Sequence, residues 1–513
     1  MSNPVTIPVR NAAQPPSLIQ ALQTDPRCYD HPVDHVQMIE THISWVLLTG
    51  EVAYKIKKPV NLCFLDFSSL EKRKQACADE VRLNRRLAPD IYLGVVTITG
   101  NAGEPRINGT SEIFEYAVKM RQFSPEATFD CLSERGELGF VQIDALATRL
   151  AQFHSNECAT ATAESLYGEP NEILNPVRDN FRILAEQLKE PELLRKLSSL
   201  QSWSVTEHER LVPLMRQRKQ QGKIRECHGD LHLGNLAWVN AHLIIFDCIE
   251  FSAALRWIDV ISEVAFCFMD LLHRNHFDLA FRFLNAWLEA SGDYESLPLL
   301  RYYAVYRAVV RAKVAALSVN QLKNESAEIE ECLKLAEHLT RVASPQLWIT
   351  HGFSGCGKTT LSQKMLQERG MVRMRSDVER KRLAGISTLS SSNSRLAEGI
   401  YTPEFSRRTY SYLKKMAAYL LNAGWQVIID AAFLERWQRD LFRELAQQQA
   451  MPFHILDIRS DQATLEKRVA HRVAQGQNAS EADLHVLRHQ IETAQPLSPD
   501  EMHDLSEVDG NTE

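Results

Sequence analysis

The sequence lacks the features that mark membrane, secreted and zinc-binding proteins. None of its apolar runs approaches the roughly 20 residues that a transmembrane helix needs. The first sixteen residues, MSNPVTIPVRNAAQPP, do not have the basic and then apolar layout of a signal peptide. The ten cysteines show no C-x-x-C spacing, so we expect reduced core thiols rather than disulfides or zinc ligands. These absences predict a cytoplasmic protein that has no membrane partner.

The chain also lacks internal repeats and long low-complexity tracts. Its 513 residues are too many for one hydrophobic core, and the length alone predicts roughly two to four domains. Apolar residues make up 44% and charged residues 24% of the sequence. This composition is typical of compact globular domains and excludes a largely disordered or fibrous chain.

Positive charge is in slight deficit, and the deficit is uneven. The formal net charge is −7, with 37 basic and 44 acidic residues before Ser344 and 21 of each from Ser344 onward. Six acids lie in the last fifteen residues, so residues 344–498 carry 21 basic against 15 acidic groups, a charge of +6. This distribution predicts a phosphate-handling core followed by an acidic tail at 499–513. It leaves nucleic acid open as a partner, because a count cannot show a clustered basic face.

The order of strand-like and helical segments predicts two kinds of domain. After an N-terminal extension of residues 1–29, residues 30–125 are rich in β-branched and aromatic runs, with one helix expected at 68–88. Residues 126–340 have apolar residues at helical spacing. We therefore expect a small mixed lobe and a larger helical lobe. From 345 to 498 strands and helices alternate, which predicts an α/β domain with a parallel sheet.

The segment ECHGDLHLGNLAW, residues 226–238, carries polar residues at a spacing suited to phosphoryl transfer. This chemistry needs a cation on the phosphates, metal ligands, and a group that accepts the proton of the nucleophile. Asp230 would accept or orient the acceptor hydroxyl, and Asn235, spaced as in the protein-kinase catalytic loop, would hold magnesium. Asp247, in the apolar run LIIFDCIEF, would supply the second metal ligand. The alternative is a polar loop whose His and Asn side chains only satisfy buried backbone groups.

A matching lysine motif lies in the strand-like region. VAYK, residues 52–55, has the form of the kinase strand motif V-A-x-K, which would place Lys55 on the α- and β-phosphates. Glu80, on the helix that follows, is the expected ion-pair partner of that lysine. Lys57 lies on the same strand face and is the alternative for the same role. No G-x-G-x-x-G loop precedes Lys55.

HGDLHLGN with a following aspartate resembles the Brenner-type motif of aminoglycoside phosphotransferases and related small-molecule kinases, in which glycine replaces the arginine of protein kinases. The resemblance covers roughly residues 30–335. It implies a protein-kinase-like bilobal α+β fold, ATP and Mg²⁺ as cofactors, and a small-molecule hydroxyl acceptor. It also implies an adenine-binding hinge in EYAVKMRQF and a structural role for Asp259.

Two features qualify this resemblance. Cys248 follows the metal-binding aspartate, where the pattern has Gly or Phe. The likeness to aminoglycoside kinases does not identify the acceptor. The acidic surplus of this half favours a cationic acceptor, but an evenly solvated surface explains the surplus as well.

A second phosphate motif, GFSGCGKT, satisfies G-x-x-x-x-G-K-[ST] between the strand QLWIT and a helix that begins KTTLSQKML. Its glycines let backbone N–H groups turn toward phosphates, and the helix N-terminus adds partial positive charge. Lys358 would contact the β- and γ-phosphates, and Thr359 would bind magnesium. The predicted nucleotide-binding residues here are Gly352, Ser354, Gly355, Cys356, Gly357, Lys358, Thr359 and Thr360.

Motifs further along narrow the class. MRSDVERKRL places Asp377 and Arg380 one helical turn apart, and VIIDAAF puts Asp430 at the end of a buried strand, the place of a Walker-B-type metal carboxylate. The first motif resembles the D-x-x-R of polynucleotide-kinase-like and zeta-toxin-like P-loop kinases. That resemblance implies that Asp377 activates an acceptor hydroxyl and that Arg380 steadies phosphate. The alternative is a salt-bridged surface turn.

The same resemblance implies a lid helix that carries arginines over the transferred phosphoryl group. Arg468 and Arg472, in LEKRVAHRVAQG, are four residues apart and therefore share a helix face. We assign them to this lid as nucleotide-binding residues. A charged, solvated helix face is the alternative.

Together the two halves resemble a bacterial family of two-domain proteins. The sequence predicts a bifunctional ATP-dependent phosphotransferase that moves the γ-phosphoryl group to hydroxyl acceptors. Two other hypotheses stay open. In one, a catalytic half is regulated by a nucleotide-binding half that does not turn over. In the other, the P-loop half phosphorylates nucleic acid ends or nucleotide sugars.

Overall fold

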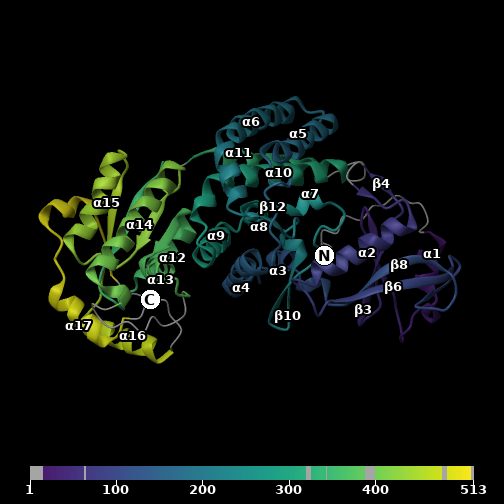
Figure 1. The fold of residues 1–513 in the computed structure, drawn as a ribbon, viewed down its shortest axis with the longest axis horizontal. Helices are drawn as coiled ribbons and strands as arrows, with labels where there is room; N and C mark the ends of the chain where they lie inside the picture. The colour runs from purple at the N-terminus through teal and green to yellow at the C-terminus, as the bar shows by residue number, and fades with distance from the viewer. Residues whose placement is uncertain are drawn as a thin grey trace. The chain divides into compact units, whose positions relative to one another are not determined.

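The structure, a computed structural model, describes residues 16–62, 65–318, 325–342, 344–387, 399–475 and 482–509. The described chain forms two compact units (Figure 1). The first unit takes in the described residues up to Arg274 together with Leu300–Thr340. The second takes in Asn275–Leu299 together with the described residues from Arg341 onward. Since Asn275–Leu299 lie inside the region predicted as the helical lobe, the chain enters the second unit once before the predicted boundary at 345.

A six-stranded antiparallel sheet forms the N-terminal lobe of the first unit, in the order β1-β2-β3-β8-β6-β7. Its strands are β1 Gln37–Glu40, β2 Ser44–Leu48, β3 Val52–Lys57, β6 Tyr92–Asn101, β7 Glu104–Ile107 and β8 Ile113–Arg121. Helix α2, Leu70–Asn84, begins after Ser69, whose hydroxyl accepts a hydrogen bond from the Lys72 backbone. It packs across β8 and β6 (Figure 1).

Part of the predicted N-terminal extension belongs to the core of this lobe. Helix α1, Ser17–Thr24, buries Leu18, Ile19 and Leu22 in the same apolar cluster as sheet residues such as Leu47 and Ile98. The first two helical turns of the described chain therefore help to hold the sheet that carries Lys55.

The second lobe of this unit is helical, as the sequence predicts. Its helices are α3 Phe129–Glu134, α4 Phe140–Gln152, α5 Pro170–Gln187, α6 Pro191–Gln220, α7 Ala253–Arg256, α8 Val260–His273, α10 Leu297–Ser318 and α11 Glu325–Thr340. Helix α8 is buried from Val260 to Leu271, which fits a sequence that is apolar on every side. The antiparallel sheet with one long helix, followed by a helical lobe, confirms the predicted bilobal α+β fold.

Short antiparallel ladders within the helical lobe hold the polar loop that contains Asp230. Strand β9, Ile224–Glu226, pairs with β12, Trp257–Asp259, and β10, Leu236–Val239, pairs with β11, His242–Ile245. The loop begins directly after β9 and ends in a 3-10 turn directly before β10. Because both of its ends are fixed in ladders, the loop has little freedom to move.

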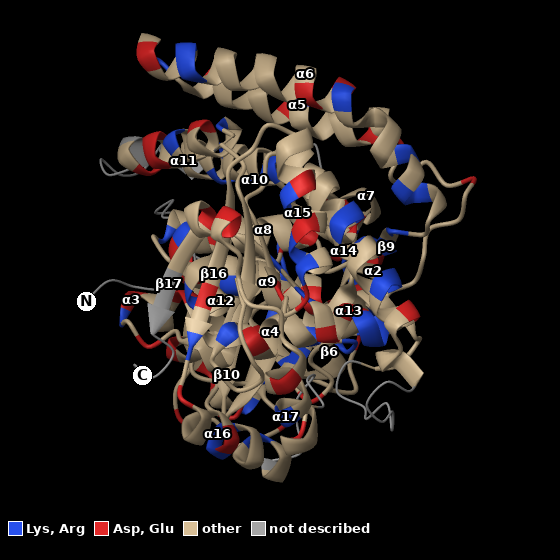
Figure 2. Ribbon diagram, turned by 90° about the vertical axis from the view of Figure 1, so that its left-hand side faces the viewer, with Lys and Arg blue, Asp and Glu red and all other residues tan. Residues whose placement is uncertain are grey.

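The described helices show no feature of a membrane span. Arginine, lysine and glutamate residues all occur along the 30-residue helix α6 (Figure 2). Among the helices in the described ranges, none is both long enough and apolar enough to cross a bilayer.

A five-stranded parallel sheet forms the centre of the second unit and confirms the predicted α/β class. Its order is β14-β15-β13-β16-β17, and each neighbouring pair is parallel. The strands are β13 Leu347–His351, β14 Val372–Arg375, β15 Val427–Asp430, β16 Phe453–Arg459 and β17 Leu505–Asp509. Its longer helices are α9 Phe277–Ser291, α12 Lys358–Arg369, α13 Ser376–Leu383, α14 Pro403–Asn422, α15 Arg436–Gln448, α16 Gln462–Gln475 and α17 Leu484–Thr493.

Helix α9 is an integral part of this unit and covers the edge strand of its sheet. The side chain of Asn285 donates to the Met371 carbonyl at 2.9 Å and accepts from the Arg373 N–H at 2.7 Å. Such bonds satisfy backbone groups that an edge strand would otherwise leave unpaired. At Gly370, a Cβ atom would lie 2.8 Å from the Phe281 ring. The packing of α9 against β14 is therefore close and specific.

The predicted acidic tail contributes to the sheet instead of extending freely from it. Residues 499–504 form a 3-10 helix, and β17 pairs with β16 along its whole length. The acids of this segment are neutralised by a row of arginines on α15. The ion pairs are Arg436–Asp500, Arg439–Glu501 and Arg443–Asp504.

Replacing Glu501 with glutamine should destabilise the second unit by about 3 kcal/mol, because a buried arginine would lose its charged partner. Arg439 and Glu501 are both almost fully buried and share two hydrogen bonds, of 2.7 and 3.2 Å. Burial alone would raise the pKa of Glu501, but hydrogen bonds from Arg439 and Ser498 outweigh burial and lower this pKa to about 2. The folded pKa lies below the ordinary value of 4.5. The pair therefore stabilises fully above that pH, and its contribution is lost as the pH falls through about 2.

Thermal unfolding of the full chain between pH 7 and pH 2.5 checks this expectation. Glu492→Gln, which changes an exposed acid on α17, serves as the control and should unfold like the wild type. Equal stability of Glu501→Gln and the wild type at pH 7 would show that the ion pair contributes nothing.

Candidate active sites

Two lysines on β3 point toward the same glutamate of α2. Lys55 and Lys57 are two residues apart and so share a face of the strand. The Lys55 Nζ atom lies 2.9 Å from Glu80 Oε1 and also contacts Asp247 Oδ1. Lys57 contacts the other oxygen of Glu80 and a carboxylate oxygen of Glu250, and it is fully buried. The structure thus brings Lys55 together with both of its predicted partners and places Lys57 behind it.

The pKa shifts of the two lysines and of Glu80 favour their charged forms. Burial would lower the pKa of Lys55, but the carboxylates of Asp247 and Glu80 outweigh it and raise the pKa well above its ordinary value. Burial would raise the pKa of Glu80, and the two lysines reverse this shift and lower it. Lys55 therefore presents a fixed positive charge beside Asp247, whose side chain is 42% exposed.

Hydrogen bonds fix the shape of the loop that contains Asp230. The His228 Nε2–H group donates to the Phe246 carbonyl at 2.8 Å, and Nδ1 accepts from the Asp230 backbone at 3.3 Å. Burial lowers the pKa of His228, so the neutral ring that these two bonds require is favoured. The Asn235 side-chain amide donates to Asp230 at its carbonyl (2.9 Å) and its carboxylate (3.2 Å). Asp230 and Asn235 are therefore neighbours, as their spacing predicts.

Gly229 occupies the position at which protein kinases carry arginine, and its environment explains the glycine. Its φ is +91°, and a Cβ atom would lie 2.9 Å from the Leu255 carbonyl oxygen. Its N–H donates to Glu263 Oε1 at 2.8 Å, and the other oxygen of Glu263 contacts His154 Nε2 at 2.7 Å. Glu263 thus fixes the loop backbone at Gly229, and His154 fixes Glu263. No local sequence motif indicates this role.

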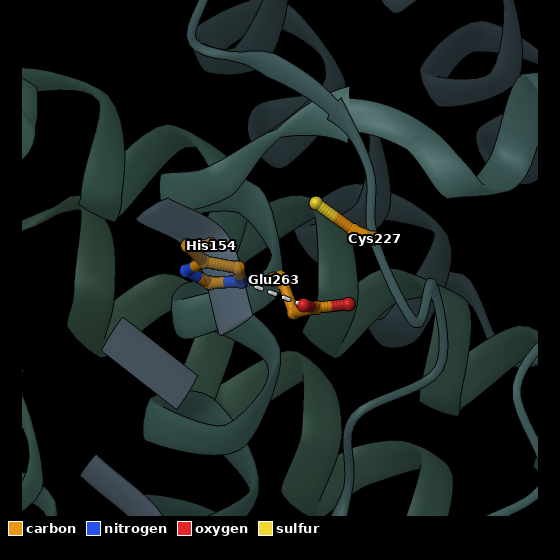
Figure 3. Close-up of side chains that lie close together, drawn as sticks. All are labelled: His154, Cys227 and Glu263. Carbon is orange, nitrogen blue, oxygen red and sulfur yellow. Dashed lines mark hydrogen bonds and ion pairs between the residues drawn. The ribbon is translucent and has the colours of Figure 1, made fainter. Parts of the chain in front are cut away.

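His154 and Glu263 also form, with Cys227, a buried group whose donor atoms lie within 4.8 Å of one another (Figure 3). A metal would need the Cys227 thiolate, but burial raises the pKa of this thiol well above its ordinary value. Both carboxylate oxygens of Glu263 already accept hydrogen bonds or ion pairs from the protein. The arrangement fits a structural support for the loop and agrees with the expectation of reduced core thiols.

Asp247 has a backbone conformation that is unusual for a residue with a side chain. Its φ is +62°, its N–H donates to the Tyr92 hydroxyl at 3.0 Å, and the next N–H, of Cys248, donates to Asn84 at 2.8 Å. Such conformations cost energy and are concentrated at functional sites. Cys248 itself is fully buried, with its sulfur 3.2 Å from the His228 carbonyl. A small thiol therefore fits where the family pattern has Gly or Phe.

The donor set at this site suits magnesium. The amide nitrogen of Asn235 is used toward Asp230, which leaves the amide oxygen for another partner. One oxygen of Asp247 contacts Lys55, and within the described ranges the other oxygen forms no hydrogen bond or ion pair. Magnesium prefers oxygen ligands of this kind. Asn235 and Asp247 would therefore hold the ion.

In the second unit, the P-loop follows β13 as predicted. Gly352 has a φ of +144°, and a Cβ atom there would lie 2.7 Å from the Ile458 carbonyl oxygen, so only glycine fits. Gly357, with a φ of +100°, directly precedes α12. The Lys358 Nζ group donates to the carbonyls of Gly352 (2.9 Å) and Phe353 (2.7 Å). The side chain of Lys358 thus folds back over the P-loop and contacts the loop backbone.

Helices α16 and α17 pack directly on this loop. A Cβ atom at Gly355 would lie 3.0 Å from the Leu465 carbonyl of α16. The Ser354 N–H donates to the Gln490 side chain of α17 at 2.9 Å. Gln490 belongs to no recognisable sequence motif, so the sequence did not predict its contact with the P-loop. Its position beside the loop follows from the packing of α17 alone.

Asp430 ends β15, next to the helix that follows the P-loop. It is 5% exposed, and its Oδ2 atom accepts from the Ser362 hydroxyl at 3.2 Å. Ser362 lies one turn after Thr359 on α12, and the side chain of Thr359 is exposed. The Thr359 hydroxyl and the Asp430 carboxylate supply oxygen ligands that suit magnesium.

Asp377 and Arg380, the residues of the predicted D-x-x-R pair, lie in surroundings that differ from each other. Asp377 is half-buried in the first turn of α13, after β14. The Arg380 Nη1 group donates to the Ile400 carbonyl (2.9 Å) and the Ser406 hydroxyl (3.0 Å). Arg380 therefore connects Ile400, before α14, with Ser406 at the start of that helix, and its assignment to phosphate stays a prediction.

The two arginines predicted for a lid, Arg468 and Arg472, lie on α16, the helix that packs on Gly355. Burial lowers the pKa of Arg472, and the nearby carboxylate of Asp377 opposes that shift. Arg472 is thus within electrostatic range of Asp377. Arg468 is half-buried one turn earlier on the same helix face.

A further arginine pair near Asp430 was missed by sequence reasoning. The Arg375 Nη1 group lies 2.8 Å from Glu289 Oε1, and Arg375 Nε is 3.9 Å from Asp430 Oδ2. Arg373 is 3.4 Å from Glu289 and 3.3 Å from the Thr359 carbonyl. Glu289 lies on α9, more than eighty positions before the arginines. Only the fold brings them together.

Comparisons with known proteins found a family model that matches the P-loop region and relatives that match most of the chain. Residues 347–497 match the family described as AAA domain. Proteins of Mycobacterium tuberculosis and Mycobacterium bovis, both named uncharacterized protein, are 30% identical over 430 residues, which is 82% of this chain and 84% of each relative.

Solved structures of two kinds are similar to the chain. A choline/ethanolamine kinase family protein from Mesorhizobium loti is 10% identical, with a TM-score of 0.38, over 63% of this chain and 95% of that one. A gluconokinase from Sinorhizobium meliloti is 19% identical, with a TM-score of 0.25, over 33% of this chain and 85% of that one.

Proposed function

We infer the function of the chain from two findings: it belongs to the same protein family as the mycobacterial relatives, and it has the kinase-like and P-loop folds of phosphotransferases. From that premise we propose that it is a bifunctional ATP-dependent enzyme. Each unit would transfer the γ-phosphoryl group of ATP to a hydroxyl acceptor at its own site. The observation that carries this proposal is the placement of Lys55 between Glu80 and Asp247 in the first unit. Such a group of charges suits the binding of phosphates and a metal ion.

In the first unit, Lys55 binds the phosphates of ATP, and Glu80 and Lys57 hold it in place. Asp230 orients the hydroxyl of a small-molecule acceptor and takes up its proton. As this happens, the acceptor oxygen bonds to the γ-phosphorus, the bond between the γ-phosphorus and the bridging oxygen breaks, and ADP leaves. Magnesium held by Asn235 and Asp247 would neutralise charge on the phosphates.

In the second unit, the P-loop N–H groups and Lys358 bind the β- and γ-phosphates. Thr359 and Asp430 would hold magnesium. Asp377 orients the second acceptor, and Arg472, with Arg468, stabilises the charge of the transferred group. Arg375 also lies beside Asp430, which adds a fourth positively charged side chain to this site.

Removing magnesium should abolish transfer in both units, because the phosphates of ATP would keep charges that the lysines alone cannot neutralise. The measurement is label transfer from γ-labelled ATP, with magnesium or with excess chelator, to polyols, sugar acids, aminoglycosides, nucleotide sugars and oligonucleotide ends. Transfer that survives the chelator would contradict the metal assignments. ATP binding without transfer to any acceptor would contradict the proposed function and favour a nucleotide-sensing module.

A further inference from the structure

A buried arginine lies on the side of Asp230 in the first site. Arg307, on α10, is 5% exposed, and its guanidinium carbon lies 4.7 Å from the centroid of the Phe266 ring and 5.3 Å from that of Tyr306. Its Nε atom is buried without a hydrogen-bond partner, and within the described part of the chain Arg307 forms no ion pair. A buried cation without a counter-charge is costly. Arg307 is therefore a group that a ligand could satisfy.

Three contacts connect Arg307 to the proposed base. The Phe266 ring below its guanidinium is 5.7 Å from the His232 ring, centroid to centroid. His232 Nε2 is 3.5 Å from Asp230 Oδ2. Burial would raise the pKa of Asp230, and it is lowered instead by His232, with His228 and Arg307 also contributing. Arg307 thus lies within electrostatic range of Asp230.

The other charged groups on this side already have partners. Asp270 accepts a hydrogen bond from the Leu233 N–H at 2.9 Å, and its charge is shared between two arginines. The Arg274 Nε atom lies 3.8 Å from Asp270 Oδ2. Arg311 is attracted by the Asp270 carboxylate and forms an ion pair with Glu328 at 3.7 Å. Arg274 and Arg311 thus each have a carboxylate within ion-pair distance, whereas within the described part of the chain Arg307 has none.

We propose that the acceptor of the first unit carries an anionic group, a carboxylate or a phosphate, which Arg307 binds while a hydroxyl of the same molecule lies at Asp230. This inference rests on the proposed function. A guanidinium matches such oxyanions with two parallel hydrogen bonds, and the flanking rings keep its plane fixed. The acidic surplus of this half favours a cationic acceptor. This surplus is a count over the whole half, however, and does not describe the charges next to Asp230.

The test uses the full chain with Lys358→Met, so that the P-loop does not contribute, and compares four acceptor sets of similar size: sugar acids, polyol phosphates, uncharged polyols and amino sugars. We expect transfer to one of the two anionic sets. For that set, Arg307→Leu should raise the acceptor KM about ten- to hundred-fold with a smaller change in kcat. Arg307→Lys should retain part of the affinity. Arg182→Leu removes an exposed arginine on α5 and should have no effect.

The outcomes separate this inference from the proposed function. Preference for amino sugars, or an equal loss of kcat for every acceptor in Arg307→Leu, would overturn the inference and leave the function standing. Absence of transfer to every acceptor would overturn the function. Calorimetric binding of the same compounds then decides the inference. Binding of the anionic compounds that Arg307→Leu abolishes supports it, and binding that is absent or unchanged in the variant overturns it.

Discussion

Replacing Asp230 with asparagine should lower phosphoryl transfer by the first unit about 10²- to 10⁴-fold, the usual contribution of a positioned proton acceptor. Asparagine has the same shape, so the contact with Asn235 and the loop held by His228 and Glu263 should persist. ATP should bind with nearly unchanged affinity, because Lys55 and its partners are untouched. The measurement is label transfer to the acceptor of the first unit, together with nucleotide binding.

Asp90→Asn provides the matched control, since Asp90 is an exposed aspartate of the same unit. It should leave transfer and binding unchanged. If Asp230→Asn keeps full transfer, the polar loop serves only to satisfy buried backbone groups. A parallel loss of ATP affinity and of folding stability would show that the substitution acts through structure.

Replacing Lys358 with methionine should lower phosphoryl transfer by the second unit roughly 10²- to 10³-fold, as loss of one charged donor at a transition state does. Methionine retains the length and apolar character of the side chain, so α12 should stay folded. The hydrogen bonds from Lys358 to the Gly352 and Phe353 carbonyls are lost, and the loop N–H groups remain. Transfer and ATP hydrolysis are measured beside Asp230→Asn.

Lys364→Met is the control on the same helix, because the Lys364 side chain is 67% exposed. The informative result is the pair of variants taken together. If each substitution removes a different activity, the chain contains two enzymes. If Lys358→Met removes every activity and Asp230→Asn removes none, the first unit is a binding or regulatory module.

The sequence predicts those parts of the sites that local spacing determines. Asp230 and Asn235 meet because five positions of a tight loop separate them. The P-loop turns tightly from strand to helix because its glycines permit positive φ. Lys55 and Glu80 meet because a strand and the following helix pack in a fixed way. These three arrangements can be predicted from local spacing and from the packing that the fold class implies.

Other parts of the sites depend on contacts between distant positions, which periodicity cannot reveal. Glu263 supports Gly229 from a helix that reads as apolar core, and Glu289 reaches Arg375 from another helix far upstream. Arg380 shows the opposite case. Its spacing from Asp377 fits a catalytic pair, yet its donors hold the Ile400 carbonyl and Ser406. A motif predicts which residues are near one another along the chain, and tertiary packing decides which partner each one takes.

The early passage of the chain through the second unit limits how this protein can be divided. A single cut at residue 345 would leave the P-loop part without Asn285, whose side chain satisfies the backbone of β14. The P-loop part so separated would expose a sheet edge that α9 normally covers. The second unit therefore keeps a covered sheet edge only in a chain that still contains Asn275–Leu299.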